Sequence, residues 1–179
     1  MTKKQELFKS VTVLVLICFA VSAALAVVHS FTEPVSARNA ALREDEARRQ
    51  VLPDAASFEE VEAALPESVL SCYLGKAADG GALGYVFLVE GRGFGGPIQV
   101  LCAIGTDGRI VRCHTLDVSG ETKTLGGKTA DSAYTDQYIG KDAALSGVNT
   151  ISQATVTSTA YRGCVEEAFR AYAQIREGK

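Results

Sequence analysis

The sequence predicts an α+β protein in which an N-terminal transmembrane helix is followed by an antiparallel β-meander packed against a C-terminal helix. Three observations predict this class. Residues 11–28 carry no charged side chain, and residues 69–118 alternate β-rich runs with turn sequences. Residues 160–175 repeat small and apolar side chains at helical spacing. The expected order is therefore one helix, a sheet, and a helix that covers one face of the sheet.

The composition excludes several classes of function. The 179 residues suffice for one ordinary domain with an appendage. The net charge is −3 and basic residues do not cluster, so we expect no nucleic-acid partner. The five cysteines show no CxxC spacing that would indicate a zinc or iron–sulfur site. His29 ends an apolar run, so His114 is the remaining candidate for a catalytic base. It stands in no recognisable triad, which favours a structural role for His114. The sequence therefore shows no set of residues for hydrolysis.

The N-terminus predicts a retained membrane anchor. At 1.5 Å per residue, residues 11–28 reach about 27 Å, close to a hydrocarbon core of ~30 Å. Lys3, Lys4 and Lys9 precede this run. By the positive-inside rule the N-terminus is cytoplasmic and the rest of the chain lies outside the cell membrane.

A cleaved signal peptide is the alternative to an anchor. Residues 24–26 read as a small-x-small cleavage site. The apolar run is longer than the ~7–15 residues of a signal sequence, which favours the anchor.

The predicted domains are, in order, a cytoplasmic tail, a transmembrane helix, a helical spacer and an extracytoplasmic domain: residues 1–10, 11–29, 30–66 and 67–179. Within the spacer, residues 36–52 are rich in Ala, Arg and Glu, with Ser36 as the expected N-cap and Pro53 as the stop. Residues 58–65 can form a further short helix.

The extracytoplasmic domain predicts a meander of four strands. The expected strands are residues 69–74, 83–90, 98–104 and 109–118. Asp107-Gly108 between the last two is a strong hairpin signal. The glycine-dense loop at 91–97 resembles a dinucleotide fingerprint only loosely, and it joins two strands instead of opening a helix, so a Rossmann interpretation fails. Residues 129–138 predict a short helix before the last one.

A run of hydroxyl side chains precedes the last helix. Residues 149–158 contain five Ser and Thr residues. The first N–H groups of a helix have no intrahelical partner and the helix dipole favours negative charge there, so this run can form an anion site. The alternative is that Ser152 or Thr155 is only an N-cap.

Four motifs in fixed order carry a resemblance. They are GFGGP at 93–97, ETKTLG at 121–126, DQYIGK at 136–141 and SQATVTS at 152–158. Together with the anchor they resemble the membrane-anchored FMN-binding subunits of ion-pumping respiratory complexes. These are the G subunit of the Rnf ferredoxin:NAD⁺ oxidoreductase and the related C subunit of the Na⁺-translocating NADH:quinone reductase.

The resemblance implies an electron-transfer subunit of an Rnf-type complex, redox-active but not a complete enzyme alone. It implies FMN attached covalently through its phosphate by a flavin transferase, with other membrane subunits of the complex as partners and no catalytic or metal-binding residues. The implied cofactor-binding residues are Thr155, which carries the phosphoester, and Ser152, Ala154, Val156, Thr157, Ser158, Glu121, Thr122, Leu125 and Gly126. The alternative function is a non-enzymatic membrane-anchored binding or assembly module without a cofactor.

Some positions depart from the family pattern. Asn149 replaces Asp, Gln153 replaces Gly, and residues 123–124 replace Pro-Gly. A phosphodiester on Thr155 would sit at the helix entrance, and we expect three neighbouring hydroxyls to donate hydrogen bonds to it: those of Ser152, Thr157 and Ser158. Apart from Cys18, the cysteines are even in number and permit three complete pairings.

Overall fold

The computed structural model describes residues 3–63 and 65–177. The chain divides into two compact units, residues 1–43 and 44–179, and each is described by itself. Helix α1 (Lys3–Val51) begins in the first unit and ends in the second. From Val11 onward it is long and apolar enough to cross a membrane, by length and composition, with a mean hydropathy of 2.9 over its most apolar window.

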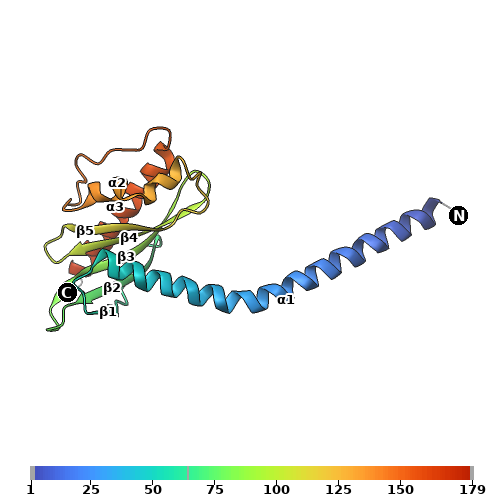
Figure 1. Cartoon of the computed structure of the whole chain (residues 1–179), viewed down its shortest axis with the longest axis horizontal. Coiled ribbons are helices and arrows are strands. Elements are labelled where there is room, and N and C mark those ends of the chain that lie inside the picture. Colours follow the sequence, from blue (N-terminus) through green and yellow to red (C-terminus); the bar gives the residue numbers. More distant parts are fainter. Residues whose placement is uncertain (1–2, 64, 178–179) are drawn as a thin grey trace. The chain divides into compact units, whose positions relative to one another are not determined.

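The expected helix start at Ser36 is wrong, because α1 continues without a break through Pro34 (Figure 1). A proline inside a helix removes one backbone hydrogen bond and costs about 3 kcal/mol. The stretch after Pro34, at residues 37–43, is rich in Ala, Leu and Arg, which favour the helix. Ser36 is therefore an interior residue of α1, and residues 30–51 of the expected spacer belong to the same helix as residues 11–29.

The second unit contains an antiparallel sheet with strand order β1-β2-β3-β4-β5. The predicted meander is confirmed, including the turn at Asp107-Gly108, where Gly108 has φ +78° and Gly105 N–H donates to the Arg109 carbonyl at 2.8 Å. The strands are β1 (Ser57–Glu60), β2 (Val69–Lys76), β3 (Ala82–Arg92), β4 (Pro97–Gly105) and β5 (Ile110–Asp117).

Strand β1 stands where a short helix was expected at residues 58–65, so that expectation is wrong. Its residues pair with the end of β2, with Ser57 opposite Lys76 and Glu60 opposite Tyr73. Only Phe58 of this strand is even half-buried. Pairing with a neighbouring strand, which the local sequence does not reveal, decides its conformation.

Both faces of the central strands are covered. Helix α3 (Thr155–Glu177) packs on one face, as predicted, against the side chains of Phe87, Val100 and Cys102. The other face was not expected to be covered. There the end of α1 and the residue after it pack on β3 and β4, and the buried members of this cluster are Ala47, Val51, Leu52, Val86, Leu88, Leu101 and Ala103. The uninterrupted apolar runs of β3 and β4 reflect these two covered faces.

The segment between β5 and α3 forms three short helical pieces in place of the one helix expected at 129–138. They are η1 (Gly126–Ala130), α2 (Ser132–Thr135) and η2 (Asp136–Tyr138). Tyr134 and Tyr138 pack against Tyr161 of α3, with ring centroids 5.3 and 5.4 Å away. These aromatic contacts hold the segment beside the start of α3.

Candidate functional site

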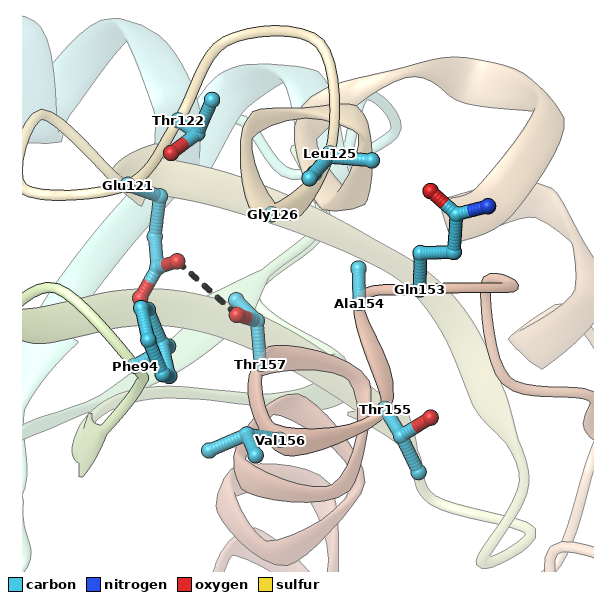
Figure 2. A pocket seen from close by; sticks show the side chains of 10 residues that line it. All are labelled: Phe94, Glu121, Thr122, Leu125, Gly126, Gln153, Ala154, Thr155, Val156 and Thr157. Atoms are coloured by element: carbon cyan, nitrogen blue, oxygen red, sulfur yellow. Dashed lines mark hydrogen bonds between the residues drawn. The ribbon is translucent and has the colours of Figure 1, made fainter.

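A pocket of about 360 Å³ lies at the start of α3 (Figure 2). Three segments far apart in the sequence form it: the tip of the β3–β4 hairpin, the loop after β5, and the first turn of α3. The lining residues are Phe94, Glu121, Thr122, Leu125, Gly126, Gln153, Ala154, Thr155, Val156 and Thr157. The volume falls in the range typical of small-molecule sites.

The first turn of α3 begins without a capping side chain. The first intrahelical hydrogen bond runs from Ser158 N–H to the Ala154 carbonyl at 2.9 Å. Ala154 therefore holds the N-cap position, and its methyl group cannot accept a hydrogen bond. The alternative that Ser152 or Thr155 is the N-cap is wrong. By helix geometry the N–H groups of the next three residues, 155–157, have no intrahelical acceptor.

A tight turn leads the chain into α3. The Ala154 N–H donates to the Ile151 carbonyl at 3.0 Å, and Gln153 within this turn has φ +65°. The Ser158 hydroxyl accepts a hydrogen bond from Ile151 N–H at 3.0 Å. This side chain is buried, so it fastens the turn to the helix instead of facing the pocket.

Thr155 is the first residue of α3, and its side chain is exposed. In Figure 2 its hydroxyl points away from Glu121 and lies at the rim of the pocket. The adjacent Val156 is 54% exposed. A large group joined to the Thr155 oxygen would therefore start at the uncapped helix end without displacing buried side chains.

Glu121 connects the three segments of the pocket. Glu121 is only 8% exposed, and its carboxylate accepts hydrogen bonds from the Thr157 hydroxyl at 2.9 Å and the Gly95 N–H at 3.0 Å. The backbone approaches this carboxylate so closely that a side chain at either of two glycines would require the carboxylate to move. A Cβ at Gly93 would lie 2.2 Å from one carboxylate oxygen, and a Cβ at Gly126 would lie 2.3 Å from the other.

The structure gathers most of the predicted site residues around the pocket. Eight of them line it: Thr155, Ala154, Val156, Thr157, Glu121, Thr122, Leu125 and Gly126. Ser152 is exposed and Ser158 is buried, and neither lines it. The hydroxyls of Thr157 and Ser158, expected to donate to a phosphate, have protein partners here: Thr157 donates to Glu121, and Ser158 accepts from Ile151 N–H.

Two lining residues, Phe94 and Gln153, were missed. Phe94 stands alone among glycines at a hairpin tip, and that isolation was the available signal. The DQYIGK element has a different role, since Gln137 exchanges hydrogen bonds with the Asn149 backbone at 2.8 and 3.2 Å. It holds the loop that precedes the site.

The other candidate groups lie elsewhere. Partial burial lowers the pKa of His114, which does not line the pocket. The cysteines are free thiols, and the Sγ atoms of Cys102 and Cys113 lie 3.6 Å apart in the core. Burial raises the pKa of Cys72 and of Cys164 to about 12. Within residues 3–63 and 65–177, no three His, Cys, Asp or Glu side chains gather as a metal site would require.

Known proteins identify the class to which this site belongs. Residues 93–170 match the family model of the FMN-binding domain, and this stretch includes every residue that lines the pocket. The pocket suits such a ligand, because unpaired helix N–H groups can hold a phosphate and apolar side chains stand beside them. The chain thus contains an FMN-binding domain.

Two curated relatives narrow the class. The chain is 31% identical over 155 residues to the G subunit of the Na⁺-translocating ferredoxin:NAD⁺ oxidoreductase complex of Acetobacterium woodii, covering 72% of this chain and 73% of that protein. It is 26% identical over 176 residues to the G subunit of the proton-translocating complex of Clostridium ljungdahlii, covering 93% and 91%. The chain belongs to this family, the G subunits of ion-translocating ferredoxin:NAD⁺ oxidoreductase (Rnf) complexes, as its motifs predicted.

A solved structure also shows similarity. It is the C subunit of the Na⁺-translocating NADH-quinone reductase from Parabacteroides distasonis, at 18% identity and a TM-score of 0.48, covering 58% of this chain and 61% of that one.

Proposed function

We propose that this chain is an electron-transfer subunit of a membrane-bound, ion-translocating ferredoxin:NAD⁺ oxidoreductase, carrying FMN joined through its phosphate to Thr155. The observation that carries the proposal is the exposed Thr155 hydroxyl at an uncapped helix start that lines the pocket. Its relatives are named as subunits of such complexes. When bound, FMN supplies the one- and two-electron chemistry, and the protein supplies its position and surroundings.

The helix start suits a phosphodiester. Such a group carries one negative charge, and the N–H groups of residues 155–157 point out of the helix end with no intrahelical acceptor. An N-cap hydroxyl or carboxylate would compete for these donors, and Ala154 offers neither. The absence of a cap thus leaves the donors to the ligand.

Attachment requires an activated donor. A flavin dinucleotide can serve as the donor of FMN. The Thr155 oxygen then forms a bond to the FMN phosphorus, and the pyrophosphate bond of the dinucleotide breaks. The nucleoside monophosphate leaves, and the hydroxyl proton is released. A flavin transferase would catalyse this step. In the part of the chain that the structure describes, no side chain that could act as a base is hydrogen-bonded to Thr155. The exposed position of the hydroxyl allows another protein to reach it.

The apolar lining suits the flavin ring. Leu125 and Val156 come from different segments and both line the pocket. Their contact with a planar aromatic ring would remove apolar surface from water, at about 25 cal/mol per Å². Electron transfer itself needs no general acid or base, and the site presents none besides Glu121.

The experiment is intact mass after co-expression with and without a flavin transferase. We expect one FMN-sized increment on the peptide that contains Thr155, with the flavin retained on denaturation. Thr155→Ala should lack the increment, whereas Thr155→Ser should keep it. Thr159→Ala is the matched control, because Thr159 is an exposed hydroxyl in the next turn of the same helix that does not line the pocket.

Each other result counts against the proposal. An increment on Thr159 or on another peptide would refute the attachment site. No increment at all would favour the alternative function, a membrane-anchored binding or assembly module without a cofactor.

The proposed place of the protein is the cell membrane. Residues 11–29 would cross it, with the tail at 1–10 in the cytoplasm and the flavin domain outside, and other subunits of the complex as partners. The long apolar helix and the basic residues before it support this topology. Reporter fusions at both ends of the chain test it. Protein released into the medium or periplasm, shortened near residue 26, would instead indicate a cleaved signal.

A further inference from the structure

We propose that Phe94 contacts the isoalloxazine ring of the flavin and covers one of its faces. This inference rests on the proposed function, because it concerns the same pocket. Phe94 is not among the cofactor-binding residues that the family resemblance implies.

The backbone beneath Phe94 is firmly placed. Gly93 N–H donates to the Gly96 carbonyl at 2.9 Å, which leaves Phe94 and Gly95 as the tip of the β3–β4 hairpin. Gly95 N–H is held by Glu121 at 3.0 Å. A Cβ on Gly95 would lie 1.9 Å from the Gly120 carbonyl oxygen, so the tip rests directly against the loop after β5. Such close approach requires glycine on both sides of the phenylalanine.

The Phe94 side chain, in contrast, has little to pack against. It is 80% exposed although it lines the pocket. Single exposed apolar residues are common and need no explanation. Phe94 is not single, because Leu125 and Val156 line the same pocket from two other segments. Three apolar side chains from three segments that converge on one cavity suit an apolar ligand group.

The pocket also gives the ligand a direction. In Figure 2 Thr155 and Gln153 lie at one side of the pocket, and Phe94 lies at the other side, beside Glu121. Covalent attachment at Thr155 fixes the phosphate end. The ring, at the far end of the ribityl chain, would then lie toward Phe94. Offset stacking of a phenyl group on an aromatic ring is favourable beyond the area that it buries.

The test uses the full-length chain with FMN on Thr155, verified by mass, and compares two tryptophan variants. The chain contains no tryptophan. An indole in contact with an excited flavin donates an electron to it and quenches its emission. Phe94→Trp should therefore lose most of its flavin fluorescence. Leu70→Trp is the matched control, because Leu70 is an apolar side chain on β2 that is 51% exposed and lies outside the pocket. We expect its emission to equal that of the wild type.

A second variant tests coverage of the ring. Phe94→Ala should make the flavin emission more sensitive to quenching by iodide, since one face is uncovered. Equal emission from the two tryptophan variants, or equal iodide quenching of Phe94→Ala and wild type, would overturn the inference. Either result on protein with FMN on Thr155 leaves the proposed function standing. A chain without FMN on Thr155 would defeat the proposed function, and this inference with it.

Discussion

The first turn of α3 and the turns that follow it have opposite properties. The later turns bury a continuous stripe against the sheet and the short helices: Tyr161, Cys164, Val165, Ala168, Phe169, Ala171, Tyr172 and Ile175. The first turn has alanine as its N-cap, exposed side chains at Thr155 and Val156, and a left-handed Gln153 just before it. The alanine cap and the left-handed glutamine are both unfavourable by the local rules for helix starts.

The contrast shows that the start of α3 is locally less stable than the buried turns that follow it. The buried turns of α3 hold the helix in place, so its start does not need to be optimal. A helix end that lacks a cap keeps its N–H groups free for a ligand. Local rules are commonly broken at functional sites, and at the start of α3 they are broken at Gln153 and Ala154. Stability and ligand binding are then separated along α3, and substitutions in its two parts should have different consequences.

Phe169→Ala should give the largest effect, in the stabilising part of the helix. Phe169 is 8% exposed in the main core, and loss of such a ring costs about 3–5 kcal/mol. Urea unfolding followed by circular dichroism would measure it. The folded fraction should still accept FMN on Thr155. A loss below ~1 kcal/mol would contradict the stabilising role assigned to the buried turns of α3.

Glu121→Ala should have the next largest effect, because Glu121 joins the first turn of α3 to the tip of the β3–β4 hairpin. The change leaves the Gly95 N–H and the Thr157 hydroxyl without their acceptor, and hydrogen bonds to a charged group contribute about 1.5–3 kcal/mol. Glu121→Gln keeps one carbonyl oxygen and should lose less in the same urea experiment. Equal losses in the two variants would show that the acceptor oxygens are not what matters.

The sequence predicted the parts of the fold that depend on local signals. The β-rich runs and the Asp107-Gly108 turn specified four strands and their antiparallel order. Strand β1 was missed because its conformation depends on pairing with β2. The continuity of α1 was missed because Ser36 was interpreted as an N-cap, although the helix continues through it. The covering of the second sheet face depends on contacts between distant residues.

The motifs predicted most of the residues that gather at the pocket, but they did not predict how those residues are arranged. Eight of ten expected residues line the pocket. Thr157 was expected to face a phosphate, yet its partner Glu121 lies 36 positions away in the sequence. Phe94 enters the site only because its hairpin rests on Gly120. Hydroxyl-rich runs indicate where a ligand can bind, but the hydroxyls that remain free depend on tertiary contacts.

Ala154→Ser should give α3 the capping side chain that its first turn lacks. A serine there can accept a hydrogen bond from the free N–H groups of the first turn and should stabilise the protein by about 1 kcal/mol. The same hydrogen bond would compete with a phosphate, so we expect slower attachment of FMN to Thr155 under fixed transferase conditions. Thr159→Ala, outside the pocket, is the control for both measurements. Faster attachment in Ala154→Ser would contradict the role assigned to the missing cap.

Gln153→Gly should give the smallest effect and tests the turn itself. A left-handed conformation costs a non-glycine residue about 1–2 kcal/mol, and Gln153 has φ +65°. Glycine removes that cost but gains ~0.4–1 kcal/mol of freedom in the unfolded chain, so the net stabilisation should be about 0.5 kcal/mol. Gln153→Ala keeps the strain and isolates the side chain. If the glycine and alanine variants are destabilised equally, the contacts of the Gln153 side chain stabilise the protein by more than its left-handed backbone conformation costs. The first turn would then be less strained than its dihedral angle indicates.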